Sequence, residues 1–235
     1  MKKILFIGLL SLVFHQNNFA QELPKAITTA VSGLTKKDAG LGVKEALSNG
    51  VVNAVLRLNR TDGFFKDQAY KILMPPDAKK VEKTLRSVGL GDMVDKAILQ
   101  INRGAEDAAG YAKPIFLDAI KQMTLTDAIG LVKNGDTSAT HFFRTKTLDK
   151  LTAAFLPVIK ASLNKVDATK YYGEAVAQYN GFPLTRKKIN PDLAGFVTAK
   201  TIDALFDLIS KEELNIRNNF GARTSDILKK VFGQK

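Results

Sequence analysis

The chain has 235 residues, 45% of them hydrophobic and 25% charged, which is typical of a globular protein with one sizeable core or two small ones. It contains no cysteine, which excludes disulfide bonds, thiolate catalysis and cysteine-ligated metal sites. Its net charge of +12 at pH 7 favours anionic partners.

The first twenty residues have the layout of a secretory signal peptide. Lys2 and Lys3 precede an apolar run over residues 4–14, and Ala20 offers a small residue for cleavage. The run is shorter than the roughly 20 residues that a membrane-spanning helix needs. A buried N-terminal helix is the alternative interpretation. We expect an exported, periplasmic protein from which residues 1–20 are removed.

The basic charge suggests which neighbours the exported chain meets. An exported protein does not normally encounter nucleic acid, so no nucleic-acid partner is expected. Anionic lipid head groups, lipopolysaccharide phosphates and peptidoglycan are the plausible anionic surfaces of the cell envelope. The alternative is that the basic surface only keeps the protein soluble.

Apolar residues recur at helical spacing along most of the remaining chain, and no segment shows the alternation of a β-strand. The sequence therefore predicts an all-α fold. We expect a flexible lead-in over residues 21–38 and a single compact multi-helix domain, similar to a helical bundle, over residues 39–235. Helices are predicted over residues 35–58, 76–88, 92–108, 114–123, 124–134, 136–143, 147–163, 167–179, 192–209 and 227–232.

Residues 124–147 carry the clearest helix boundaries. Thr124 and Asp127 have the spacing of a capping box, in which each side chain accepts from a backbone N–H of the first turn. Asn134 and Gly135 can end that helix in a left-handed conformation, and Asp136 is predicted to cap the next one. Further N-caps are predicted at Asp92, Thr147 and Asp167, and at either Asp192 or Thr198.

The longest segment without periodicity covers residues 60–76 and is rich in apolar side chains. Apolar loops of this length usually pack onto a surface or cover a cavity. Together with the aromatic pair after the predicted helix start at Asp136, this loop supplies the candidate ligand-binding residues. They are Phe64, Phe65, Tyr70, Phe142, Phe143 and Arg144.

Groups suited to nucleophilic or metal chemistry are sparse. Without the leader His141 is the single histidine, so sites with several histidine ligands are excluded. Asp136, Ser138 and His141 form the only local set that resembles a nucleophilic triad. Working triads hold the acid on the far side of the imidazole, and Asp136 is better explained as an N-cap. We expect no catalytic residue, no metal and no cofactor.

Two clusters of charged residues near the C-terminus are candidates for functional sites. Asp203 and Asp207 share a predicted helix face, but flanking lysines favour a solvent-exposed face with ion pairs over a carboxylate site. Glu213, Arg217 and Arg223 surround a predicted helix break, and a structural network that holds the last helix is favoured over a site.

Four motifs resemble an exported bacterial family known as a domain of unknown function, DUF4197. They are GVKEALSNGVVNAV, FFKDQAYKILMPPDAKKVEKTLRSVGLGDMVD, DAIKQMTLTDAIGLVKNGDTSATHFFRTKT and ARTSDILKKVFG. The resemblance runs from about Ala39 to Phe232. It implies an all-helical periplasmic domain, and it implies no reaction, ligand or catalytic residue.

Three functions remain open from the sequence. The first is a non-catalytic envelope protein that binds an apolar or amphipathic ligand, such as a lipid, between its helices. The second is an interaction module that uses its basic surface on anionic lipid or on a protein partner. The third, an envelope hydrolase, is the weakest because acid–base residues are few and scattered.

Overall fold

The computed structural model describes residues 36–183, 185, 187–222 and 229. These residues form eight α-helices and two short 3-10 helices and contain no strand, so the predicted all-α fold is confirmed. The signal peptide and, apart from residue 229, the final predicted helix over 227–232 lie outside the described residues. The helices are α2 (Lys36–Leu58), η1 (Pro76–Ala78), α3 (Lys79–Ser87), α4 (Gly91–Ala109), α5 (Ala112–Gln122), α6 (Leu125–Lys133), α7 (Ser138–Asn164), α8 (Ala168–Gly181), α9 (Leu193–Asn218) and η2 (Phe220–Ala222).

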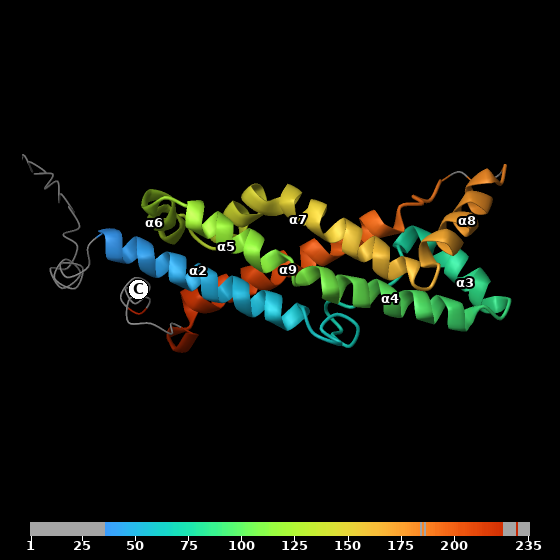
Figure 1. Cartoon of the computed structure of the whole chain (residues 1–235), viewed down its shortest axis with the longest axis horizontal. Coiled ribbons are helices and arrows are strands. Elements are labelled where there is room, and N and C mark those ends of the chain that lie inside the picture. Colours follow the sequence, from blue (N-terminus) through green and yellow to red (C-terminus); the bar gives the residue numbers. More distant parts are fainter. Residues whose placement is uncertain (1–35, 184, 186, 223–228, 230–235) are drawn as a thin grey trace, which may run out of the picture. The chain divides into compact units, whose positions relative to one another are not determined.

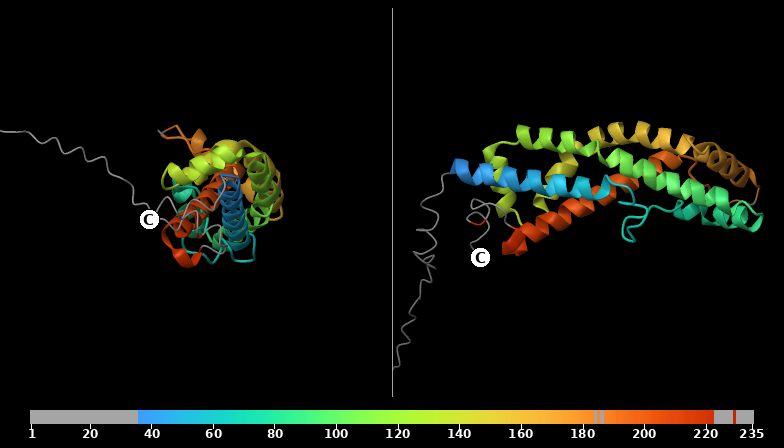
Figure 2. Two further views of the ribbon diagram at one scale, coloured as in Figure 1. Left: turned by 90° about the vertical axis from the view of Figure 1, so that its left-hand side faces the viewer. Right: turned by 60° about the horizontal axis from the view of Figure 1, so that its bottom comes forward.

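Helices α7 and α9 hold the fold together. α7 packs against α4, α5, α8 and α9, and α9 also contacts α2 and α4 as it runs obliquely across them (Figures 1 and 2). Phe116, Phe143 and Phe206 meet where α5, α7 and α9 come together. The Phe116 ring lies edge-on to the rings of Phe143 (5.4 Å) and Phe206 (5.9 Å). This aromatic cluster is fully enclosed or nearly so and forms the middle of the core.

Helix α7 is longer than predicted. The sequence indicated a new helix starting at Thr147, but Thr147 lies buried inside one continuous helix of 27 residues. Its hydroxyl donates to the carbonyl of Phe143 at 2.7 Å instead of capping a helix start. Phe143, Thr147, Leu151 and Phe155 recur every four residues and bury one face. The prediction of two helices is wrong because that continuous face favours one.

The predicted helix boundaries are partly confirmed. The Thr124–Asp127 capping box is present, with the Asp127 N–H donating to the Thr124 hydroxyl at 3.0 Å. Gly135 has a φ of +84°, as its helix-ending role requires. Asp192 caps α9 by accepting from the Gly195 N–H at 2.8 Å.

Other predicted caps are absent among the described residues. Asp92 does not cap α4, which already begins at Gly91. Asp167 occupies the N-cap position of α8 without a capping bond from its side chain. Asp136 does not cap α7 either: Thr137 holds the N-cap position with a φ of 65° and makes no capping bond. Glu213 of α9 supplies the acceptor for the first turn instead.

Alanine at Asp192 and at Asp136 should therefore have unequal effects. Asp192→Ala removes a real capping acceptor and should lower the free energy of unfolding by about 0.5–2 kcal/mol. Asp136→Ala removes an exposed side chain without a capping bond and should change it by less than about 0.5 kcal/mol. Urea denaturation of both variants measures the difference. A larger loss at Asp136 than at Asp192 would contradict this assignment of the caps.

Candidate functional site

The loop over residues 59–75 joins α2 to η1 and is held by two buried side chains of α4. Asn102 accepts from the Ile72 N–H (2.9 Å) and donates to the Ile72 carbonyl (2.8 Å). One turn later, Glu106 accepts from the backbone N–H groups of Phe64 and Phe65, each at 3.1 Å. Leaving one of these buried groups unpaired would cost about 1–3 kcal/mol. The 59–75 loop is thus fixed to α4 at two points.

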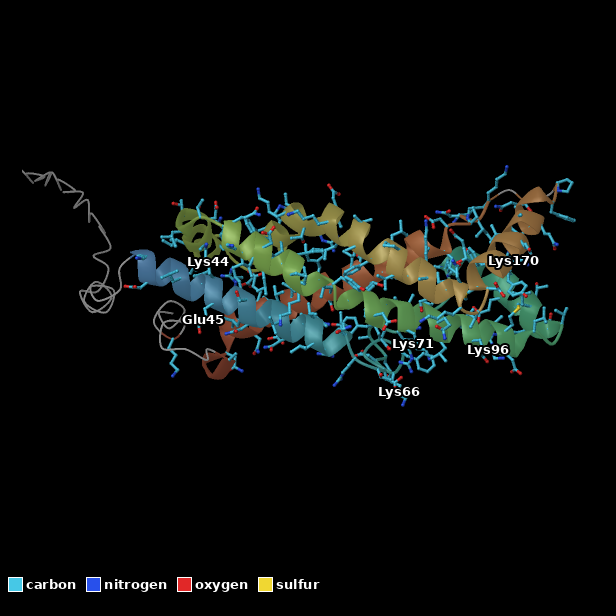
Figure 3. All side chains as sticks on the ribbon, viewed as in Figure 1. Lys44, Glu45, Lys66, Lys71, Lys96 and Lys170 are labelled. Carbon is cyan, nitrogen blue, oxygen red and sulfur yellow. The ribbon has the colours of Figure 1, made fainter. Side chains whose placement is uncertain are left out.

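A chain of ion pairs fixes the outer part of the same loop. Arg103 pairs with Glu106 at 2.6 Å and with Asp62 at 2.9 Å, and Lys66 reaches the other oxygen of Asp62 at 2.8 Å. The hydrogen bonds from Lys66 and then Arg103 lower the pKa of Asp62. Lys66 and Lys71 point away from the helices beside the loop (Figure 3). At this edge the charge of Lys66 is balanced by that of Asp62.

An open groove of about 620 Å³ lies between the 59–75 loop and one face of α9. We call it the α9 groove. Its volume falls within the range of about 300–1,000 Å³ typical of small-molecule sites. Apart from the adjacent pair Asp203 and Ala204, the α9 residues follow one another at three- and four-residue spacing, so they share one helix face. The lining residues are Ala69, Tyr70, Lys71, Ile72, Leu73, Met74, Pro76, Lys79, Phe196, Lys200, Asp203, Ala204, Asp207 and Lys211.

One end of the α9 groove is closed by a hydrogen-bonded cluster. The Tyr70 hydroxyl donates to Asp207 at 2.7 Å and accepts from Lys211 at 3.0 Å, and Lys211 pairs with Asp207 at 2.7 Å. Burial, and then the neighbouring Asp207, raise the pKa of Tyr70, whereas the bond from Lys211 lowers the pKa of Asp207. At neutral pH the Tyr70 phenol therefore stays protonated, and its hydrogen bonds join the 59–75 loop to α9.

The remaining charges of the α9 groove are mainly positive. Asp203 is paired with Arg144 at 3.2 Å. Lys79 and Lys200 form no ion pair with any described residue. Lys71 lies over the ring of Phe65, with its ammonium 4.3 Å from the ring centroid. The groove therefore combines an apolar floor with lysines available to an anionic group.

Two smaller hollows adjoin the α9 groove. One, of about 330 Å³, lies between α7 and α9, includes Arg144 and shares Asp203 with the groove. The other, of about 280 Å³, reaches α8 and shares Pro76 and Phe196 with the groove. The outer surface of the first half of α9 is thus hollowed on several sides.

The structure distributes the six predicted ligand-binding residues over different environments. Tyr70 lines the α9 groove and Arg144 lines the neighbouring hollow. Phe64 and Phe143 are fully buried and belong to the core. Phe65 and Phe142 are half-buried, and Phe142 packs edge-on against Phe143 at 5.8 Å. The six side chains therefore do not form one site.

Glu213 and Arg217 form a buried pair at the α6–α7 turn, with side-chain exposures of 6% and 10%. Glu213 accepts from the backbone N–H groups of Ala139 (3.1 Å) and Thr140 (2.9 Å), which lie in the first turn of α7. Arg217 pairs with Glu213 at 2.7 Å and donates to the carbonyl of Leu131 in α6, also at 2.7 Å. The pair thus joins the end of α6 to the start of α7. Arg223 lies outside the described residues.

Most of the side chains considered for catalysis already form hydrogen bonds or ion pairs within the protein. The Ser138 hydroxyl donates to the Leu131 carbonyl at 2.7 Å and accepts from Arg217 at 2.9 Å, while His141 is exposed. Asp203 pairs with Arg144 and Asp207 pairs with Lys211, as described above. Among the described residues, no three histidine or acidic side chains gather where they could hold a metal ion.

Asn102 and Glu106, which shape the loop side of the groove, were missed in the sequence. Both lie on the apolar helix predicted over 92–108, at positions i and i+4 on one face. A polar pair on a buried face is the signal that could have identified them, since such groups need partners from another segment.

Among known proteins, the chain matches a family model but no curated protein and no solved structure. Among the described helices, none has the length and apolarity to cross a membrane. The family described as "Protein of unknown function (DUF4197)" matches residues 33–233. Because that match covers most of the chain, as the resemblance of its motifs predicted, the protein belongs to the DUF4197 family.

Proposed function

We propose that this protein is an exported, non-catalytic binder of an amphipathic ligand with an acidic head group, and that the α9 groove holds the ligand. The observation that carries the proposal is the composition of the groove. It has the volume of a small-molecule site, an apolar floor, and three lysines, Lys71, Lys79 and Lys200, that form no ion pair with a described residue.

The lining indicates how such a ligand would lie. Ile72 and Met74 are buried, while Leu73 keeps 55% of its surface exposed over the groove. An acyl chain along these side chains would remove apolar surface from water, at about 25 cal/mol per Å². Lys79 and Lys200 would face the acidic head group, which a compact ammonium attracts as a point charge.

Export is part of the proposal and rests on the N-terminal pattern of two lysines, an apolar run and Ala20. In the envelope, single-chain and phosphorylated lipids are the ligands that combine an apolar chain with an anionic group. The basic surface of the chain suits such ligands as well.

The test uses a naturally fluorescent fatty acid, cis-parinaric acid, and its uncharged methyl ester. Leu73→Asp places a charge on the groove floor and should weaken binding of both probes about tenfold or more, because a lost apolar contact of this size is worth roughly 1.5–3 kcal/mol. Lys200→Glu should weaken binding of the acid much more than that of the ester. Fluorescence titration of the purified protein measures both.

Leu56→Asp is the matched control. Leu56 is a leucine of similar exposure, 58%, on α2, and it does not line the groove. The control should bind both probes like the unmodified protein. Failure of the unmodified protein to bind either probe, or equal losses in Leu56→Asp and Leu73→Asp, would overturn the proposal.

A further inference from the structure

Exposed apolar side chains gather at one end of the helices. Val88 (66% exposed) and Phe182 (61%) are the two most exposed large apolar side chains among the described residues. Val88 and Leu90 lie in the turn between α3 and α4, and Phe182 follows the C-terminal end of α8. These two segments lie at the same end of the helices in both figures (Figures 1 and 2). We call this region the α3–α8 end.

Backbone hydrogen bonds fix both tips of the α3–α8 end. In the first, the Leu90 N–H donates to the Leu85 carbonyl at 2.9 Å, and Gly89 adopts a φ of +85°, which is the geometry of a Schellman motif. In the second, the Thr185 N–H donates to the Phe182 carbonyl at 3.0 Å. Both tips are therefore hydrogen-bonded turns. They keep apolar side chains exposed to water, which is unfavourable for the folded protein.

The charges around these tips are predominantly positive. Lys96 of α4 and Lys170 of α8 extend from this end (Figure 3). Arg86 pairs with both Asp95 (2.7 Å) and Glu82 (3.0 Å), which together leave one negative charge in excess. Around the two tips, six exposed lysines form no ion pair with a described residue. Three exposed acidic residues there are likewise unpaired among the described residues. The lysines are Lys80, Lys83, Lys96, Lys165, Lys170 and Lys188, and the acids are Asp92, Asp167 and Glu174.

We propose that the α3–α8 end docks onto the surface of an anionic lipid bilayer. Val88, Leu90 and Phe182 would enter the head-group region, where apolar and aromatic side chains are stabilised. The surrounding lysines would contact the anionic head groups, to which their positive charges are attracted. Neither a helix that crosses the membrane nor a lipid anchor is needed, because two apolar tips and a basic rim act together.

The experiment is co-sedimentation of the purified protein with vesicles. One set contains equal amounts of phosphatidylethanolamine and phosphatidylglycerol, and the other contains only phosphatidylcholine. We expect binding to the anionic vesicles that weakens as salt is added, because salt screens exposed charges. The double variant Val88→Asp with Phe182→Asp should bind these vesicles about tenfold less, and Lys96→Glu with Lys170→Glu should reduce binding by a similar factor.

Leu56→Asp again serves as the control, since Leu56 is equally exposed but belongs to α2. It should sediment with the vesicles like the unmodified protein. Absence of binding to anionic vesicles, equal binding to phosphatidylcholine, or equal losses in the control and the double variant would each overturn the proposal. The tip variants should keep their affinity for parinaric acid, so failure here is distinguishable from failure of the groove proposal.

Discussion

Replacing Glu213 with alanine should lower the free energy of unfolding by about 3–5 kcal/mol, because it removes the carboxylate of a buried ion pair. Arg217 would lose its ion pair with Glu213. The N–H groups of Ala139 and Thr140 would also lose their acceptor at the start of α7. Both consequences act on the folded state, so the loss should appear in the equilibrium stability.

Urea denaturation followed by circular dichroism measures this loss. Lys150→Ala is the control, because the Lys150–Asp118 pair is about half exposed and should contribute less than about 1 kcal/mol. Glu213→Gln keeps an acceptor for the helix start while removing the charge, so it should lie between the two. If Glu213→Ala and Lys150→Ala have equal midpoints, the pair does not hold the α6–α7 turn.

Phe155→Ala should also cost about 3–5 kcal/mol, because it leaves a ring-sized cavity in the core. Phe155 is fully buried on α7, the helix with the most extensive packing against its neighbours. The midpoint of urea unfolding should fall while the denaturant slope stays similar, since the surface exposed on unfolding changes little.

Lys187→Ala provides the contrast on the surface. Lys187 pairs with Asp77 at 2.7 Å, but its side chain is 79% exposed, so solvent screens the interaction. The midpoint should stay nearly unchanged. Equal shifts in the Phe155 and Lys187 variants would mean that α7 does not bury the face described above.

Local signals in the sequence predicted most of the helices. The Thr124–Asp127 box and the Gly135 turn were found because their partners lie within a few residues. The α7 start was mispredicted because its cap comes from Glu213, more than seventy residues away. Local pattern favoured Asp136 there, and no short-range rule can indicate a carboxylate supplied by another helix.

The α9 groove was harder to predict than the fold. Its two sides are the 59–75 loop and α9, which are remote in sequence, so no single motif contains the site. Loop aromatic residues were chosen as ligand contacts, yet Phe64 is enclosed by the core. Aromatic side chains carry the largest gain on burial, and an apolar loop residue therefore enters the core unless other contacts prevent it.

The two-point attachment of the 59–75 loop to Asn102 and Glu106 has a consequence for association with any ligand. Ordering a flexible loop on binding costs conformational entropy, at roughly 1–2 kcal/mol for each backbone residue that becomes fixed. Here Phe64, Phe65 and Ile72 are already hydrogen-bonded in the free protein. The groove wall is therefore preorganised. A ligand would not have to order this loop, so loop ordering would not reduce the affinity that its contacts provide.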